Sequence, residues 1–186
     1  MQPAQKLKTT KDLLALPDQT FKVHELLEGE IFVSEHPSLN HQRLIGNLIF
    51  LLDKYLMKNF AGKFWFRPGV IFDEYNSVIP DLVFVAKDRI PQIASGIHIV
   101  GAPDLAIEIM SPGSENVRRD QIVKRQTYAR FGVKEYWIVE PIVEVIEISR
   151  LQNNVLASVG TFRNTDEISS PLLPDLSFTM QDVFRK

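Results

Sequence analysis

The stretch that most constrains the fold runs from Gly101 to Glu140 and reads GAPDLAIEIMSPGSENVRRDQIVKRQTYARFGVKEYWIVE. It contains an apolar segment at 104–110, a turn at 111–114, a helical segment at 117–131 and a second apolar segment at 136–139. Ser114 is the expected N-cap of the helix, and Gly132 is the expected residue that ends it. A strand, a helix and a strand within this length are typical of a βαβ unit. We therefore predict two parallel, neighbouring strands.

The first of these strands has a carboxylate in its apolar core. Residues 105–109 read Leu-Ala-Ile-Glu-Ile, which favours a strand covered on both faces. Burying an ionised carboxylate without a partner is costly, so Glu108 needs one. On the following helix Lys124 shares a face with Tyr128 and Phe131, which predicts that it points at the sheet. A functional Glu108–Lys124 pair competes with two structural alternatives, a buried ion pair and a lysine that reaches past Tyr128 to water.

The composition excludes several classes of protein. The chain has 186 residues, 45% hydrophobic and 24% charged, which predicts one globular domain over 1–186 with a mobile leader at 1–9. There is no cysteine, so disulfides and thiolate metal sites are excluded, and a reducing cytoplasm is the expected location. We expect no signal peptide and no membrane-spanning segment, because no apolar stretch of either kind is present. The net charge of −2 does not indicate a generally basic nucleic-acid binder, so such binding would need a local patch.

The rest of the chain predicts short strands and three further helical segments. The expected helices are a short one capped by Thr9 or Thr10, an amphipathic one at 40–59 and a tail at 180–184. Between the elements we expect turns at 28–29 and 75–77, a loop at 87–100 with at most one helical turn, and a proline turn around Pro171 and Pro174. The expected strands are 21–27, 30–34, 63–66, 70–72, 82–86, 142–148 and 156–159.

A second acid precedes another apolar strand. Asp81 follows Pro80 and stands 27 positions before Glu108, so the two carboxylates could lie on adjacent strands and bind a divalent cation through oxygen. Asp104, after Pro103, competes for the role of Asp81. It is four residues from Glu108 along one strand, a separation of about 13 Å, which is too far to share one ion. Asp81 is therefore the expected partner of Glu108, and Asp104 is read as a residue that starts a strand.

These residues resemble the PD-(D/E)xK nuclease pattern, in which two acids and a lysine form the site. The usual lysine position, two residues after the second acid, holds Met110, whereas Lys124 resembles the form in which the lysine has moved to the following helix. More narrowly, the chain resembles the Uma-type family of restriction-endonuclease-like proteins over roughly residues 11–148. The segments that carry this resemblance are VHELLEGE at 23–30, PDLVFV at 80–85, PDLAIEIMSPGS at 103–114, Asp120 with Lys124, and EYWIV at 135–139.

The resemblance implies an α/β fold with a central mixed sheet flanked by helices. It also implies that Asp81 and Glu108 hold Mg²⁺ or Mn²⁺ and that Lys124 lies near the scissile phosphate. The expected function is a Mg²⁺-dependent endonuclease that hydrolyses phosphodiester bonds in DNA. Lys124 could orient or deprotonate the attacking water, or counter developing charge. The alternative is a non-catalytic module on a nuclease fold that binds nucleic acid or protein, and a weaker one is a hydrolase of another phosphate ester.

Further residues could add to the site. Glu30 is either a further acid at the site or a solvated strand acid, and His41, at the start of the long helix, is more often a cap or surface residue than a functional one. Asp120 stands one turn before Lys124 and is expected to form a salt bridge that positions it. Cleavage of duplex DNA with one site per chain favours a homodimer. A further expectation is a phosphate-facing patch on the helix, formed by Arg118, Arg119 and Arg125. The Tyr136-Trp137 pair is expected in the core.

Overall fold

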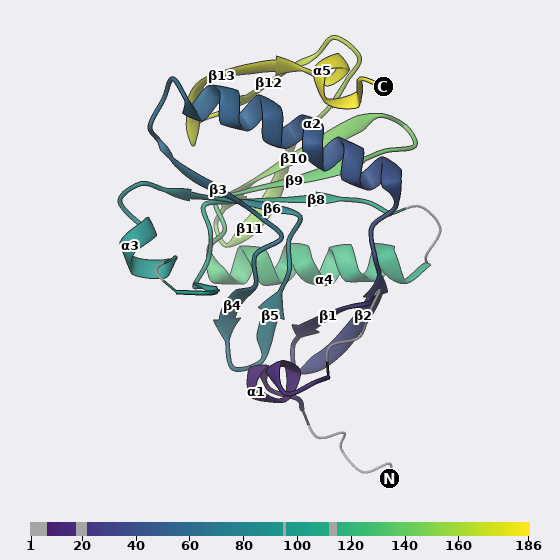
Figure 1. Ribbon diagram of the computed structural model, residues 1–186, viewed down its shortest axis with the longest axis vertical. Coiled ribbons are helices and arrows are strands. Elements are labelled where there is room, and N and C mark those ends of the chain that lie inside the picture. The colour runs from purple at the N-terminus through teal and green to yellow at the C-terminus, as the bar shows by residue number, and fades with distance from the viewer. Residues whose placement is uncertain (1–6, 18–21, 95, 112–114) are drawn as a thin grey trace.

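The computed structural model describes residues 7–17, 22–94, 96–111 and 115–186, and for 115–121 it describes the backbone without the side chains. Within these ranges a six-stranded sheet lies at the centre, with helix α2 on one face and helix α4 on the other (Figure 1). A five-stranded sheet lies on the same side of the central sheet as α4, and a two-stranded sheet lies next to the C-terminal helix. The predicted α/β class, with mixed sheets flanked by helices, is confirmed.

The central sheet has the strand order β11-β10-β9-β8-β6-β3. In the described part β8 and β9 are parallel, and the other neighbouring strands are antiparallel. The strands that begin near Asp81, Asp104 and Glu135 therefore belong to one sheet, as predicted. In the order given, the strands are Val155–Arg163, Val145–Gln152, Glu135–Glu140, Leu105–Ile109, Leu82–Ala86 and Gly62–Phe66.

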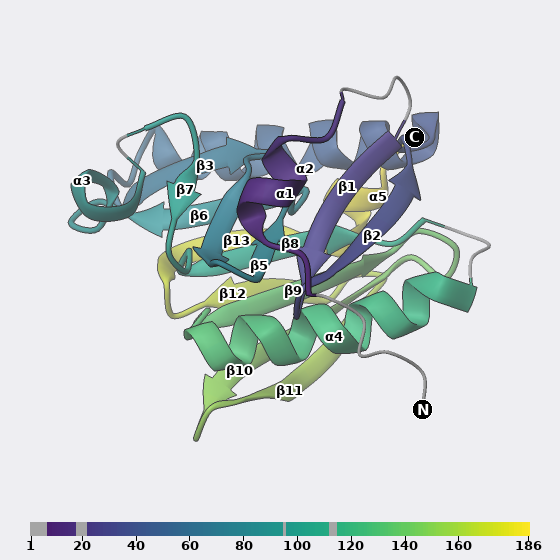
Figure 2. The ribbon, with the colours of Figure 1, turned by 90° about the horizontal axis from the view of Figure 1, so that it is seen from below.

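The second sheet has the order β2-β1-β5-β4-β7, and β12 pairs with β13 near the C-terminus. Figure 2 shows the hairpin β1–β2 beside α4, both on the same side of the central sheet. The five strands of the second sheet are, in that order, Glu30–Glu35, Lys22–Leu27, Asn76–Val78, Val70–Asp73 and Ile99–Val100, and the C-terminal pair is Glu167–Ser170 and Leu173–Thr179. The helices are α1 Thr10–Leu14, α2 Leu39–Leu56, α3 Ile90–Ile93, α4 Glu115–Phe131 and α5 Met180–Phe184.

The alternating faces of β8 explain why this strand is apolar throughout. Leu105, Ile107 and Ile109 pack into the core beneath α2, and Ala106 packs into the core on the α4 side. Glu108 follows the same alternation and therefore points toward α4. The βαβ prediction is confirmed, since β8 and β9 pair in parallel around α4.

The ends of the two long helices follow from local chemistry. The side chain of Ser38 caps α2 by accepting a hydrogen bond from the backbone N–H of His41 at 3.3 Å. The apolar stripe of α2 faces the central sheet, and His41 lies on the same buried side. Gly132 follows α4 with φ +87°, a left-handed conformation that suits glycine as a C-cap. The predicted N-cap of α4, Ser114, lies outside the described residues.

Some short elements differ from the predictions. Residues 76–78 form strand β5 where a turn was predicted, because the turn lies just before them at 74–75. The predicted loop at 87–100 contains the short strand β7, and β10 begins at Val145 rather than at 142. A hairpin, β12–β13, replaces the simple proline turn, since Pro174 occupies an exposed position of a two-stranded sheet where a missing N–H is tolerated. Such strands are too short, or too polar, to show a clear period.

Among the described residues, no helix has both the length and the apolar character needed to span a membrane.

Candidate active site

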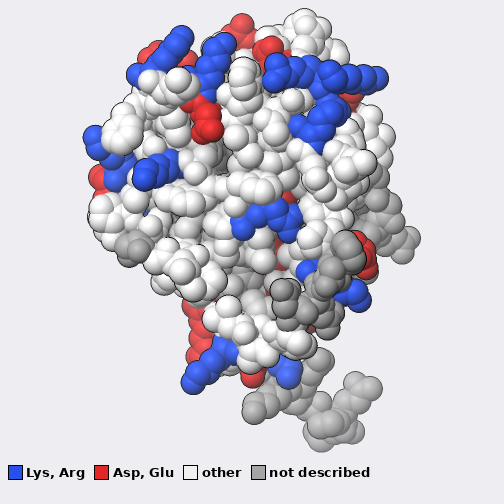
Figure 3. Space-filling view, in the orientation of Figure 1, with Lys and Arg blue, Asp and Glu red and all other residues white. Residues whose placement is uncertain are grey.

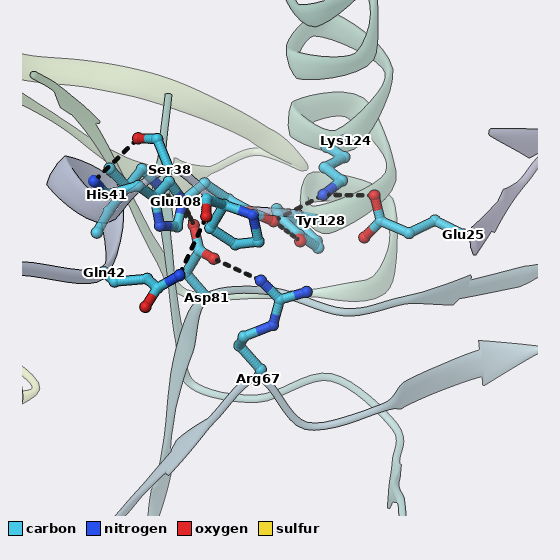
Figure 4. A network of polar contacts seen from close by, with 11 residues as sticks. Glu25, Ser38, His41, Gln42, Arg67, Asp81, Glu108, Lys124 and Tyr128 are labelled. Carbon is cyan, nitrogen blue, oxygen red and sulfur yellow. Dashed lines mark hydrogen bonds and ion pairs between the residues drawn. The ribbon is translucent and has the colours of Figure 1, made fainter. Parts of the chain in front are cut away.

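Helix α4 brings Lys124 and Tyr128 to the buried carboxylate of β8. The Nζ atom of Lys124 lies 3.1 Å from Oε1 of Glu108, and the Tyr128 hydroxyl donates a hydrogen bond of 2.7 Å to the same oxygen (Figure 4). The side chains of Glu108 and Lys124 are only 12% and 11% exposed. Lys124 therefore faces the sheet and meets Glu108, as its position on the helix predicted. The lysine does not reach past Tyr128 into solvent.

Glu25 on β1 is a third member of this cluster, and the sequence reasoning missed it. Its Oε2 lies 2.8 Å from Nζ of Lys124, and its Oε1 accepts a hydrogen bond of 2.8 Å from the backbone N–H of Ile79. Glu25 shares a strand face with Leu27, a core residue, and both are buried. An acid at an inward-facing position of a short strand was the available signal. Lys124 thus bridges two carboxylates that come from different sheets.

Asp81 immediately precedes the neighbouring strand β6, and its carboxylate is close enough to Glu108 to raise the pKa of that group. In the antiparallel register Leu82 pairs with Ile107, which places Asp81, the residue before Leu82, opposite Glu108. Oδ2 of Asp81 accepts a hydrogen bond of 2.8 Å from the backbone N–H of Ile109 and lies 3.0 Å from Nε2 of His41. Residues directly opposite in such a pair have Cβ atoms about 4.5–5.5 Å apart, close enough for both carboxylates to reach one small cation.

His41 and Arg67 flank Asp81 from two sides in Figure 4. His41 is buried, so the more common role of a cap or surface histidine does not describe it. Its Nε2 is within hydrogen-bond distance of Asp81, while its Nδ1 is buried and has no hydrogen-bond partner among the described residues. The NH1 atom of Arg67 lies 4.0 Å from Oδ1 of Asp81.

Asp104 points elsewhere, as expected, and is fully buried. Its Oδ1 lies 2.9 Å from Arg89 and 2.7 Å from Lys134, and its Oδ2 accepts a hydrogen bond of 2.8 Å from the backbone N–H of Ala86. Burial alone would raise the pKa of Asp104, but these contacts together lower it below its ordinary value. Asp104 therefore joins the end of β6 to the start of β8.

The remaining predicted residues lie outside this cluster or outside the described side chains. Glu30 is exposed at the first position of β2. Arg125 contacts Glu147 at 2.5 Å and also Ser149, both on β10, so its guanidinium is directed at the sheet rather than at a phosphate. The side chains of Arg118, Arg119 and Asp120 are not among those described.

The two aromatic residues expected in the core are buried there. Tyr136 and Trp137 on β9 are both inaccessible to solvent, and they belong to the two cores on opposite faces of the central sheet. The prediction of a core role is confirmed. Base stacking on these rings would require the sheet to open.

Burial and neighbouring charges set the protonation of the cluster. Burial raises the pKa of Glu108 to about 7; Lys124 opposes this shift, and the carboxylates of Asp81 and Glu25 add to it. Burial lowers the pKa of Lys124, but Glu108 and Glu25 outweigh that effect and raise it well above its usual range. Burial and the carboxylate of Glu108 also raise the pKa of Tyr128. Lys124 is therefore a cation and Tyr128 a neutral donor near pH 7.

The donor set suits a hard divalent cation. Asp81 and Glu108 offer carboxylate oxygens, and Mg²⁺ is commonly bound by one or two carboxylates together with water and substrate phosphate. Among the described residues, no group of three or more His, Cys, Asp or Glu side chains forms a metal cage. The two carboxylates leave coordination positions for water and a substrate phosphate, as such a cation prefers.

Comparisons with known proteins agree with this architecture. A crystal structure of a "putative nuclease belonging to DUF820" from Anabaena variabilis ATCC 29413 superposes with a TM-score of 0.77, covering 95% of this chain and 97% of that one. At 20% sequence identity this match shows a common fold. A comparison with curated proteins gives no match. The family model Uma2, described as "Putative restriction endonuclease", matches residues 10–181. The chain therefore belongs to the Uma2 family and has the nuclease-like fold of its structural neighbour.

Proposed function

We propose that this protein is a metal-dependent endonuclease that hydrolyses phosphodiester bonds in DNA. The observation that carries the proposal is that the register of β6 and β8 places Asp81, just before β6, opposite Glu108, which is in contact with Lys124. Two acids and a lysine at one point of a nuclease-like fold supply what this hydrolysis needs. Membership of a family of restriction-endonuclease-like proteins supports the same reaction class.

Asp81 and Glu108 would hold the cation, Mg²⁺ or Mn²⁺, which supplies Lewis-acid polarisation of the phosphate and activation of water. His41 and the N–H of Ile109 fix the orientation of Asp81, while Tyr128 fixes that of Glu108. Such hydrogen bonds to a ligand orient it and tune its affinity for the metal.

Lys124 acts as a positive charge beside the phosphate. Its two carboxylate partners keep it protonated, so in this arrangement it stabilises the negative charge that develops on the phosphate rather than removing a proton from water. Of the roles that the sequence left open, charge stabilisation is thus the one that the contacts favour. Glu25 holds the ammonium group in place from the second sheet.

The distribution of charge supports nucleic acid as the substrate despite the net charge of −2. On the face seen in Figure 3, basic side chains gather along the upper part, over α2 and α5, with some acidic side chains among them. A local basic surface attracts a polyanion even when the whole chain is slightly acidic. Cleavage of both strands of a duplex would require two sites, which favours a homodimer at work. The basic residues of α2, α5 and the segments that follow them include Arg43, Lys54, Lys58, Arg185 and Lys186.

A cleavage assay tests the proposal. Supercoiled plasmid, single-stranded DNA and RNA are incubated with the purified protein in Mg²⁺, in Mn²⁺ and in excess chelator. We expect nicked or linear plasmid with either metal and no cleavage with chelator. Cleavage of RNA alone would support the proposed site but would make RNA, not DNA, the substrate. Absence of cleavage in all conditions, with no metal bound, would favour the alternative of a non-catalytic binding module.

Metal affinity is expected to fall as the pH is lowered through about 7. The pKa of Glu108 is raised to about 7, so below that pH the carboxyl group is increasingly protonated and neutral, and a neutral carboxyl group is a poor ligand. Above it the group is ionised and affinity levels off. Calorimetric titration with Mn²⁺ at several values between about pH 6 and pH 8 measures this, and Glu108→Gln should remove the pH-dependent step. A wild-type affinity that stays constant over this range would contradict the assignment of Glu108 as a ligand.

A further inference from the structure

Arg67 has an unusual backbone conformation next to the candidate site. It lies in the connection between β3 and β4, with φ +44°, in the left-handed region that non-glycine residues rarely occupy. The next residue is Pro68, and a residue before proline normally prefers an extended backbone. The N–H of Arg67 donates a hydrogen bond of 3.0 Å to the carbonyl oxygen of Asp81. The chain thus holds Arg67 against Asp81 in an unfavourable conformation, an arrangement that is concentrated at functional sites.

The guanidinium group of Arg67 lies near the carboxylate of Asp81 but beyond hydrogen-bond distance. Its NH1 atom is 4.0 Å from Oδ1 of Asp81, beyond hydrogen-bond distance, and among the described residues it donates no side-chain hydrogen bond. Arg89 and Arg150, by contrast, lie 2.9 Å and 2.8 Å from their carboxylate partners. The side chain of Arg67 is 22% exposed, against 8% for Asp81. Arg67 therefore keeps free donors on the solvent side of the acids.

Lys124, the other described cation next to Glu108, already contacts two carboxylates. Lys124 contacts both Glu25 and Glu108, so its ammonium donors are directed at carboxylates. An incoming phosphodiester carries two non-bridging oxygens, and a guanidinium group can donate to both in parallel. Of these two cations, among the side chains that the structure describes, Arg67 is the one whose donors are available to such a group.

We propose that Arg67 is a phosphate-binding residue of this site. Its guanidinium group donates hydrogen bonds to the non-bridging oxygens of the nucleic-acid phosphodiester that lies over Asp81 and Glu108. This inference rests on the proposed nuclease function and adds to it the residue that recognises the substrate phosphate. It also gives a reason for the strained backbone, which fixes the backbone end of the Arg67 side chain beside Asp81.

Two variants separate the charge of Arg67 from its forked shape. Arg67→Ala removes both, and Arg67→Lys keeps the charge but loses the planar fork. Lys87→Ala is the matched control, because Lys87 lies just beyond the opposite end of β6 from Asp81, over the ring of Phe60, and its loss changes the net charge equally. Affinity for a labelled DNA oligonucleotide is measured by fluorescence anisotropy in Ca²⁺ at several salt concentrations. Steady-state cleavage is measured in Mg²⁺.

For Arg67→Ala we expect DNA affinity to fall by about 10-fold and the slope of log affinity against log salt to decrease by about one, as for the loss of one phosphate contact. Arg67→Lys should keep the wild-type slope and recover only part of the affinity and of kcat/KM. Lys87→Ala should match the wild type. Thermal unfolding and Mn²⁺ affinity are followed in parallel, and if Arg67→Ala fails to fold, Arg67→Lys carries the test.

Three results would overturn the inference. The first is that the wild type binds and cleaves DNA while the Arg67 variants keep the same affinity, salt slope and kcat/KM. This result would exclude Arg67 from phosphate binding and leave the proposed function intact. The second is loss of Mn²⁺ affinity in the variants with unchanged DNA binding, which would make Arg67 a support for Asp81. The third is a wild type that neither binds nor cleaves nucleic acid, which would remove both the inference and the proposed function.

Discussion

Replacing Lys124 with methionine is expected to lower the rate of DNA cleavage by at least about 10²-fold, the usual scale for the loss of one charge stabiliser at a reacting group. Methionine fills most of the same volume, but a thioether neither carries charge nor donates a hydrogen bond. Met110 stands where the usual motif has its lysine and cannot compensate. Plasmid nicking by wild type and variant, at equal concentrations of protein and metal, measures the effect. Equal rates would remove Lys124 from the mechanism.

The same substitution should also destabilise the protein in the absence of metal. Lys124 bridges Glu25 and Glu108, which are buried or nearly so, and its loss leaves two carboxylates without a counter-charge. Breaking a buried ion pair from one side costs about 3–5 kcal/mol. The double variant Glu25→Gln, Lys124→Met should regain part of this stability in thermal unfolding but none of the cleavage. Recovery of cleavage in the double variant would show that the single variant failed through its fold.

Replacing Asp81 with alanine is expected to weaken Mn²⁺ binding and cleavage by more than about 10²-fold. Asp81 would contribute one of two carboxylate ligands, and substituting even the outer partners of metal ligands costs about 10–100-fold in affinity. Calorimetric titration with Mn²⁺ and the nicking assay are run on the same preparation. Wild-type affinity in Asp81→Ala would exclude Asp81 as a ligand.

Asp104→Asn is the matched control for Asp81, since both aspartates follow a proline and precede a strand. Asp104 is fully buried against Arg89 and Lys134, so losing its charge should lower the free energy of unfolding by about 3 kcal/mol or more. It lies away from the cluster around Glu108, so metal affinity of the folded protein should not change. A fall in Mn²⁺ affinity as large as that of Asp81→Ala would contradict the separation of the two roles.

The sequence was sufficient where local periodicity decides the outcome. One acid in an apolar strand and one lysine on the apolar face of the next helix determined that Glu108 and Lys124 would meet, and the strand β6 placed Asp81 beside them. The geometry of a single strand was enough to separate Asp104 from Glu108. These inferences needed only the rise of a strand, the turn of a helix and the parallel pairing of a βαβ unit.

The rest of the site depends on contacts between distant segments, which periodicity does not encode. Glu25 reaches Lys124 because the second sheet lies against α4, an arrangement that no spacing in the sequence reveals. His41 is at the site because the N-terminal end of α2 approaches Asp81. The role inferred for Arg67 depends on a positive φ angle in the three-residue connection between β3 and β4, which also contains Pro68. Local propensity gives no warning of a conformation that tertiary structure imposes.

The claim that Asp81 and Glu108 share one divalent cation is tested most directly by anomalous diffraction from crystals soaked in Mn²⁺. The account predicts one peak bonded to a carboxylate oxygen of each residue at about 2 Å, with Asp104 still paired to Arg89 and Lys134. A peak coordinated by Glu25 or Asp104 instead, or saturating Mn²⁺ with no peak between Asp81 and Glu108, would contradict it.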